Sequence, residues 1–187
     1  STTGGGSEGR RTNISLAVQS CNGVILLPGE TFSYNDVLGE RTADKGYQPA
    51  GAYSDGEVVE QLGGGICQVS STLFAAVLHT DLEILTRANH SMPVSYLPMG
   101  MDATVSWGGP EFKFKNNFAY PIKISASYSG GTITFKILGA ASDKKKIEVE
   151  IKKAGEMSAE TYRKYYDENG NVTSTKRVAR SNYKPHS

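Results

Sequence analysis

The chain has 187 residues, and its 20 basic and 19 acidic side chains give a net charge of +1. Its length and its hydrophobic share of 38% suit one domain of medium size with at most a small appendage. A nucleic-acid partner needs a clustered positive face, which this balanced charge does not favour, so we expect none. No apolar run approaches the roughly 20 residues that cross a bilayer, so we expect membrane contact only through segments outside this sequence.

The first third of the chain has few regular patterns. Residues 1–12 are polar and glycine-rich, and we expect a disordered or cloning-derived leader there. Residues 13–20 predict a helix because apolar side chains recur at i, i+3 and i+4, and residues 24–27 predict a short strand before Pro-Gly. After a weakly alternating stretch at residues 31–35, the polar residues 36–56 predict a long loop of the kind that forms a binding-site wall.

The clearest predicted helix covers residues 67–79, where Val69, Leu73 and Val77 share one apolar stripe. Short alternating runs then predict strands at residues 82–87, 94–97, 103–107, 112–116, 120–128 and 132–138. The last two are joined by Ser129-Gly130-Gly131, which is typical of a hairpin turn.

The character of the chain changes near residue 141, where a lysine run precedes a second set of alternating residues. Asn169-Gly170 predicts a hairpin between residues 160–166 and 171–179. We therefore expect a leader at residues 1–12, a main domain at 13–140 and a small β appendage at 141–187 that carries no chemistry. The predicted fold class is α+β, with a cysteine-bearing helix packed on a mostly antiparallel sheet and a small C-terminal β-hairpin appendage.

The two cysteines, Cys21 and Cys67, leave two interpretations open. They could form a disulfide in an exported protein, or one could be a packing residue and the other a reactive thiol. Together with three scattered histidines they show no metal-ligand spacing. We expect neither a metal nor another cofactor.

Cys67 is the candidate nucleophile, because it follows Gly63-Gly64-Gly65 at the predicted start of a helix. Free N–H groups and the positive dipole at a helix N-terminus favour thiolate over thiol. The glycines allow a substrate to approach closely, and the N–H groups or the Gln68 side chain could stabilise an oxyanion. The competing interpretation is a small buried residue, as most cysteines of soluble proteins are.

A cysteine nucleophile needs a base, usually a histidine. His186 lies in the terminal tail, and His79 lies about 18 Å from Cys67 along the same predicted helix at 1.5 Å per residue. His90 is therefore the candidate base, and Asp102 is the candidate that orients it. A histidine bonded at a strand end and a turn-capping aspartate are the ordinary alternatives.

The order Cys, His, Asp is the one that papain-like and NlpC/P60-like cysteine peptidases use, although order alone transfers no function. Arg87 could bind a substrate carboxylate through its planar fork, or form a surface ion pair. The candidates for substrate binding or oxyanion stabilisation are Gly64, Gly65, Gln68, Ser70, Ser71, Arg87 and Ser91.

Several separated motifs, in the correct order, resemble the VanW family over residues 13–138. They are Asn22-Gly23, Pro28-Gly29-Glu30-Thr31-Phe32-Ser33-Tyr34-Asn35, Gly39-Glu40-Arg41-Thr42, the segment from Gly63 to Leu73, His90-Ser91-Met92-Pro93-Val94 and Asp102-Ala103-Thr104-Val105. The tail at residues 146–185 is similar to part of a G5-type β module.

The resemblance implies an exported or membrane-anchored protein of a Gram-positive bacterium that acts on peptidoglycan stem peptides, in a family linked to antibiotic resistance. Some clostridial members act as L,D-transpeptidases, which would make Cys67 the nucleophile that forms 3–3 cross-links. It would attack the third, meso-diaminopimelate residue of a donor tetrapeptide, expel D-alanine, and pass the acyl group to an acceptor amine. Cys21 stands where the family more often has an aliphatic residue, which favours packing over a disulfide.

Two alternatives to transpeptidation stay open. With water as acceptor the same cysteine would give a carboxypeptidase or endopeptidase, and without an activated thiol the domain would only bind peptidoglycan. YkuD-type L,D-transpeptidases place their histidine before the cysteine, whereas Cys67 precedes His90 here. A shared activity would therefore be convergent chemistry on a different fold.

Overall fold

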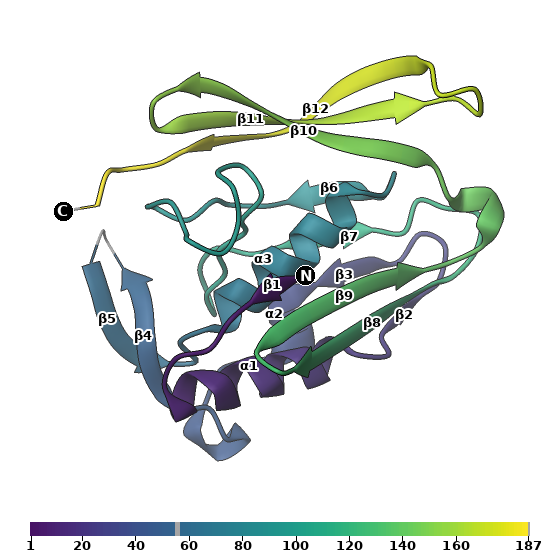
Figure 1. Cartoon of the computed structure of the whole chain (residues 1–187). Coiled ribbons are helices and arrows are strands. Elements are labelled where there is room, and N and C mark those ends of the chain that lie inside the picture. The colour runs from purple at the N-terminus through teal and green to yellow at the C-terminus, as the bar shows by residue number, and fades with distance from the viewer. Residues whose placement is uncertain (55–56, 187) are drawn as a thin grey trace.

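The computed structural model describes residues 1–54 and 57–186, and it confirms the expected α+β class with mostly antiparallel sheets (Figure 1). The helices are α1 (Glu8–Cys21), α2 (Tyr34–Leu38) and α3 (Ile66–Leu78), with 3-10 turns at Ala43–Lys45 and Ala141–Asp143. The strands are β1 (Thr2–Thr3), β2 (Ile25–Leu26), β3 (Thr31–Ser33), β4 (Pro49–Ser54), β5 (Glu57–Leu62), β6 (Glu83–Thr86), β7 (Lys113–Lys115), β8 (Ile122–Ser129), β9 (Thr132–Leu138), β10 (Lys146–Gly155), β11 (Ser158–Tyr166) and β12 (Val172–Asn182).

Within the described residues, the strands form four antiparallel sheets around α3. Their orders are β1-β9-β8-β2, β3-β7-β6, β4-β5 and β10-β11-β12. Figure 1 shows α3 in the middle of the molecule, the β8–β9 hairpin and α1 below it, and the β10–β12 sheet above it. The β4–β5 hairpin stands at one side, beyond the N-terminal end of α3.

The core forms where α3 meets these sheets, and it includes Ile14, Val69, Leu73, Phe74, Phe112, Phe114 and Ile124, each with no exposed side-chain surface. Fully burying one such side chain contributes about 1.5–3 kcal/mol. The aromatic ring of Phe74 on α3 meets the ring edge of Phe112 at 5.5 Å between centroids. The predicted apolar stripe therefore places α3, and with it Cys67, in a fixed position.

Four expectations about elements were wrong. The expected leader is ordered, because Thr2 pairs with Ile133 and α1 already begins at Glu8, capped by Ser7. The expected long loop at 36–56 contains the end of α2, a 3-10 turn and β4, while its residues 55–56 lie outside the described residues. Residues 94–97 and 103–107 are not strands.

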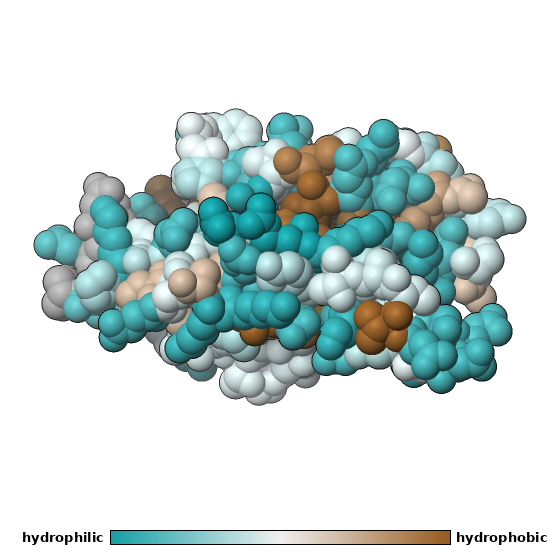
Figure 2. All heavy atoms as spheres, turned by 90° about the horizontal axis from the view of Figure 1, so that it is seen from above, coloured by the Kyte–Doolittle hydropathy of each residue, from teal (hydrophilic) through white to brown (hydrophobic). Residues whose placement is uncertain are grey.

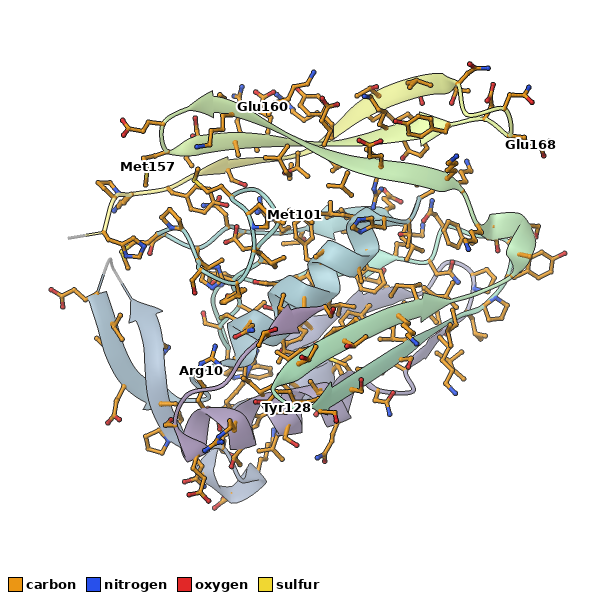
Figure 3. All side chains as sticks on the ribbon, viewed as in Figure 1. Arg10, Met101, Tyr128, Met157, Glu160 and Glu168 are labelled. Atoms are coloured by element: carbon orange, nitrogen blue, oxygen red, sulfur yellow. The ribbon has the colours of Figure 1, made fainter. Side chains whose placement is uncertain are left out.

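The C-terminal sheet is larger than the expected hairpin, since β10 joins β11 and β12 in one antiparallel sheet. Side chains of β11 alternate in burial, with Ala159, Thr161, Arg163 and Tyr165 on the buried face. Glu160 points away from the rest of the molecule (Figure 3), and the view onto this sheet in Figure 2 shows a largely hydrophilic surface with small apolar patches. One face of the sheet thus covers the main domain.

Candidate active site

Cys67 lies in the first turn of α3, behind three glycines that the local packing requires. A Cβ on Gly64 would lie 2.5 Å from the Ala50 carbonyl oxygen, and Gly65 caps the helix with a φ of +104°. Only glycine allows the β4–β5 hairpin to approach the helix start this closely. The Cys67 N–H is one of the first-turn groups that have no acceptor within the helix.

The Cys67 sulfur is half-buried and sits in a polar environment. The Val105 N–H lies 3.5 Å from Sγ, the Thr104 hydroxyl lies 3.6 Å away, and the sulfur can donate to the Val105 carbonyl at 3.2 Å. Burial opposes the thiolate, but a hydrogen bond from His90, the charge of His90 and the contacts with Val105 and Thr104 outweigh it. The pKa of Cys67 is therefore lowered from its ordinary value.

His90 is buried between Cys67 and Asp102. Its Nδ1 and its backbone N–H each lie 2.7 Å from Asp102 Oδ2, which leaves Nε2 for the hydrogen bond with the thiol. Burial favours the neutral ring, but the hydrogen bonds to Asp102 and Cys67 and their negative charges raise the pKa of His90 to about 9. The geometry thus favours a thiolate–imidazolium pair.

Asp102 has no exposed side-chain surface, and both of its oxygens are engaged. Beyond His90, the Tyr183 hydroxyl donates to Oδ1 at 2.5 Å, and Arg87 Nη2 lies 3.5 Å from the same oxygen. Burial opposes the charge, but the bonds from His90 and Tyr183 outweigh it and lower the pKa of Asp102. The structure therefore brings together the predicted residues Cys67, His90 and Asp102.

Arg87 is not placed to bind a substrate carboxylate, which corrects that interpretation. Its side chain is 4% exposed and lies over the Phe74 ring, 4.8 Å from the centroid. Nε donates to the Asp102 carbonyl at 2.8 Å and Nη1 donates to Ser181 Oγ at 2.7 Å. Arg87 belongs to the structure behind Asp102, on the side away from the cavity.

Ser70, Ser71 and Gln68 also have structural partners instead of a free polar group. Ser70 and Ser71 are fully buried and donate to the Ala103 carbonyl at 2.7 and 3.0 Å. The Gln68 amide nitrogen donates to the Thr3 carbonyl, and its oxygen accepts from Arg10 at 2.5 Å. These side chains fix the chain around Cys67, and their polar groups already have partners within the protein.

The remaining candidates divide in the same way. Gly64 and Gly65 line the cavity above Cys67, as predicted for a close approach. Ser91 does not line it, and its carbonyl accepts from the Lys184 N–H at 2.7 Å. Ser91 is therefore a docking point for the C-terminal tail.

The cavity has a volume of about 890 Å³, and both Cys67 and His90 line it. Its walls come from the β4–β5 hairpin, the start of α1 and the loop after Thr104, and its other lining residues include Arg10, Arg41, Val58, Leu62, Tyr96 and Trp107. Arg10 lies at the foot of the hairpin (Figure 3). Trp107 is 52% exposed, which provides an aromatic surface at the mouth.

Sequence reasoning missed Tyr183, Thr104, Val105 and Tyr96. Thr104 and Val105 lay within a recognised motif, so their motif could have indicated their contact with the thiol. Tyr96 meets the edge of the His90 ring at 6.4 Å, and no local pattern distinguishes it from other tyrosines. Tyr183 stands in the tail for which we expected no chemistry.

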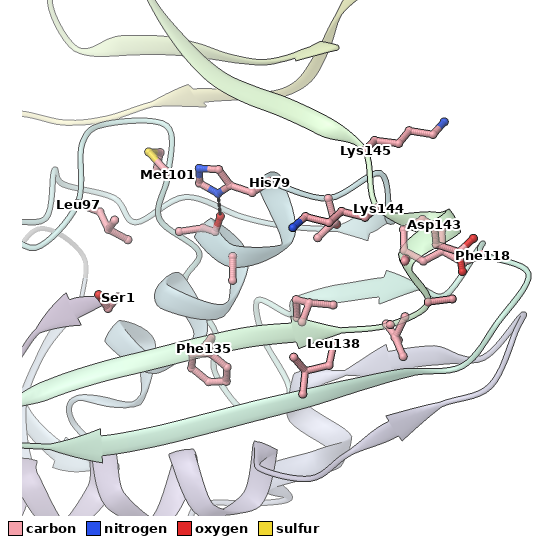
Figure 4. A pocket seen from close by; sticks show the side chains of 18 residues that line it. Ser1, His79, Leu97, Met101, Phe118, Phe135, Leu138, Asp143, Lys144 and Lys145 are labelled. Carbon is pink, nitrogen blue, oxygen red and sulfur yellow. Dashed lines mark hydrogen bonds between the residues drawn. The ribbon is translucent and has the colours of Figure 1, made fainter. Parts of the chain in front are cut away.

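A second cavity of about 710 Å³ lies at the other end of α3 (Figure 4). Phe135 and Leu138 line it with Lys144 and Lys145. His79 Nδ1 lies 2.8 Å from the Ala75 carbonyl oxygen, so this histidine closes the end of its own helix. Cys67 is not among the residues that line this cavity.

Cys21 and Cys67 are both free thiols, which excludes a disulfide between them in this structure. Cys21 is fully buried, and burial raises its pKa to about 12, as expected for a packing residue. Within residues 1–54 and 57–186, no group of three or more potential ligands is arranged to hold a metal. The described helices also include none that is long and apolar enough to span a bilayer.

The protein is an α+β domain with a cysteine-centred site. The site consists of a cysteine at a helix start, a histidine and a buried aspartate. A family model described as "VanW like protein" matches residues 9–138, and the chain belongs to the VanW family. The match leaves β10, β11 and β12 outside it.

Two curated proteins are similar to the chain. The uncharacterized protein YoaR of Bacillus subtilis (strain 168) is 49% identical over 127 residues, which cover 68% of this chain and 42% of that protein. The vancomycin B-type resistance protein VanW of Enterococcus faecalis (strain ATCC 700802 / V583) is 35% identical over 115 residues, covering 59% and 42%. The chain thus spans less than half of either relative, and no solved structure matches it.

Proposed function

We propose that this domain is a cysteine acyltransferase that forms 3–3 cross-links between peptidoglycan stem peptides. The observation that carries the proposal is the hydrogen-bonded series Cys67, His90 and Asp102, with the thiol open to a cavity of about 890 Å³. One relative is named for vancomycin resistance, which agrees with a cell-wall substrate. Stem peptides lie outside the cytoplasmic membrane, so we place the domain on that side.

In the first step the Cys67 thiolate attacks the carbonyl carbon of the third residue of a donor tetrapeptide. The oxyanion faces the free Cys67 N–H at the positive end of α3. As the intermediate collapses, the bond to the terminal D-alanine breaks, and the His90 imidazolium gives its proton to the leaving amine. The products are a thioester on Cys67, free D-alanine and neutral His90.

In the second step the side-chain amine of an acceptor stem attacks the thioester. Neutral His90 accepts a proton from that amine, a C–N bond forms and the C–S bond breaks, which restores the thiolate–imidazolium pair. The cavity volume lies near the top of the range of about 300–1,000 Å³ for ligand sites, which suits a donor and part of an acceptor together.

Water could replace the acceptor amine at the same thioester, which would give a carboxypeptidase or endopeptidase. Incubating the protein with purified disaccharide tetrapeptide and analysing the products by mass spectrometry separates these outcomes. Transpeptidation gives dimers with a 3–3 link, whereas hydrolysis gives trimmed monomers alone.

The matched variants are Cys67→Ala and Cys21→Ala, because the second removes a thiol that lies outside the cavity. We expect dimers from the wild type and from C21A but none from C67A. Trimmed monomers without dimers would show that the domain is a hydrolase and not a transferase. If the substrate stays unchanged, the remaining interpretation is a module that only binds peptidoglycan.

A further inference from the structure

We propose that Tyr183 is a positioning residue for the cysteine site, and that the β10–β12 sheet which delivers it is part of the catalytic unit. Tyr183 lies outside residues 9–138, to which the family model assigns this domain. Its catalytic meaning rests on the acyltransferase function proposed above, but its effect on the Cys67 thiol can be measured without a substrate.

The Tyr183 hydroxyl has a fixed orientation. The backbone N–H of Gly100 lies 2.8 Å from its oxygen and can only donate to it. Its other neighbours are the Arg87 guanidinium, which can only donate, and the Ser181 hydroxyl, whose oxygen already accepts from Arg87 Nη1. The phenolic proton therefore points to Asp102 Oδ1, at 2.5 Å. Tyr183 is 7% exposed, so water does not compete freely for either bond. The hydroxyl therefore serves as a dedicated donor to the carboxylate.

The two carboxylate oxygens of Asp102 have different donors. Oδ2 accepts both bonds from His90, while Oδ1 has Tyr183 and a contact of 3.5 Å to Arg87 Nη2. A contact of 3.5 Å is too long for a strong hydrogen bond. Without the Tyr183 hydroxyl, one oxygen of a fully buried carboxylate would depend on that weak contact alone.

The C-terminal sheet and the tail that follows it also contact the loop that carries His90 and the loop that carries Asp102. The Lys184 N–H donates to Ser91 O at 2.7 Å, next to His90, and Asn89 Nδ2 donates to Asn182 O at 2.7 Å. On the other loop, Thr161 on β11 donates to Gly100 O at 2.7 Å. The loops that carry His90 and Asp102 are thus fixed to each other through the C-terminal sheet.

The charged and titratable groups that face His90 and Asp102 come from four segments. They are Cys67 from α3, Tyr96 from the loop after His90, Arg87 from the end of β6, and Tyr183 from the tail. Removing the Tyr183 hydroxyl frees the carboxylate to rotate. His90 then loses its fixed direction towards the sulfur, and the thiolate loses part of its stabilisation.

The test is alkylation of Cys67 by iodoacetamide against pH in the full chain, followed at the level of the Cys67 peptide. The variant is Tyr183→Phe, which keeps the ring. The matched control is Tyr165→Phe, because Tyr165 lies on β11 and donates to an aspartate outside the site, Asp81, at 2.7 Å. Thermal unfolding of both variants measures the purely structural cost of losing a tyrosine hydroxyl.

We expect Y183F to raise the alkylation midpoint of Cys67 and to slow the reaction at pH 6 by about tenfold, one pH unit in the thiolate equilibrium. Y165F should leave the profile unchanged. In an Asp102→Asn background, Y183F should add less than about twofold, since both changes then act on one carboxylate.

Equal profiles for the wild type, Y183F and Y165F would overturn the proposal, as would an ordinary thiol profile in the wild type. A slower reaction in Y183F that persists undiminished in the D102N background would also overturn it, because the effect would not pass through the carboxylate. A shifted Y183F profile in a protein that forms no 3–3 dimers would support the positioning role and reject only the transpeptidase.

Discussion

Asp102 binds His90 twice through one oxygen, since the ring Nδ1 and the backbone N–H of His90 both lie 2.7 Å from Oδ2. This double contact fixes the ring and the main chain of His90 together. It also fixes which ring nitrogen stays available, because Nδ1 is occupied and Nε2 is left for the thiol. The orientation of the base thus depends on one buried carboxylate.

Asp102→Asn should slow acyl transfer by at least about a hundredfold, because an amide cannot hold the same protonated form of His90. The initial rate of 3–3 dimer formation measures this. Asp81→Asn is the control, since Asp81 also has a tyrosine and a cationic partner but lies outside the site. A D102N rate within twofold of the wild type would remove Asp102 from the mechanism.

The activity should follow a bell-shaped pH profile. The pKa of Cys67 is lowered, so the thiolate persists below the pH at which an ordinary thiol is protonated, and the rate is lost only when pH falls through that lowered value. The pKa of His90 is raised to about 9, so the imidazolium is lost as pH rises through about 9. Initial rates from pH 4 to 11 test this, and a rate that still rises above pH 9 would contradict the ion pair.

The C-terminal sheet should contribute strongly to stability through Arg163. This residue is 4% exposed and donates three hydrogen bonds, to the carbonyls of Val77 and Leu78 at the end of α3 and of Leu82 just before β6. Arg163→Met removes the Arg163 bonds to the Leu78 and Leu82 carbonyls, while the Val77 carbonyl keeps its bonds from Thr80. This should lower the free energy of unfolding by about 3 kcal/mol. Urea denaturation measures this, with Lys164→Met on the opposite face as control. A loss below about 1 kcal/mol would mean that the sheet is only loosely attached.

Gly64→Ala should destabilise the protein, because the new Cβ would lie 2.5 Å from the Ala50 carbonyl oxygen, a backbone atom that cannot turn aside. We expect a loss of about 1–3 kcal/mol, typical of overpacking. Gly51→Ala is the matched control in the hairpin that Gly64 contacts, where the nearest contact would be an ordinary 3.5 Å to Val58. Equal denaturation midpoints for the two variants would show that the hairpin can move away from the helix.

Local patterns in the sequence were sufficient to predict α3 and the turn between β8 and β9. The apolar stripe predicted α3 to within one residue at each end, and Gly130-Gly131 predicted the hairpin between β8 and β9. Both of these glycines have positive φ, at +58° and +78°, as the tight turn requires. Their positions needed no knowledge of distant contacts.

Residues 103–107 were misread as a strand because Ala103 and Val105 alternate with polar neighbours. Their burial is real, but they face α3 and not a neighbouring strand. The Ala103 N–H donates to Ser71 Oγ at 2.9 Å, and the Val105 N–H approaches the Cys67 sulfur. Side chains of a helix thus replace the ladder of a sheet, which alternation alone does not reveal.

Some residues of the candidate site could be predicted from the sequence and others could not. Cys67, His90 and Asp102 could be proposed from helix-start chemistry, elimination of the other histidines and chain order. Tyr183 could not, because it lies 81 residues beyond Asp102 in a segment whose own pattern indicates only a β structure. Arg87 was left as a candidate for substrate binding or a surface ion pair, because sequence does not show whether a guanidinium faces solvent or a buried partner.

Whether Cys67 carries the acyl group is tested most directly by the intact mass of the protein during turnover with a donor tetrapeptide. We expect an adduct equal to the donor minus its terminal D-alanine, located on the Cys67 peptide, discharged by acceptor and absent in Cys67→Ala. Dimer formation with no adduct on Cys67, or the same adduct in C67A, would contradict this role of Cys67.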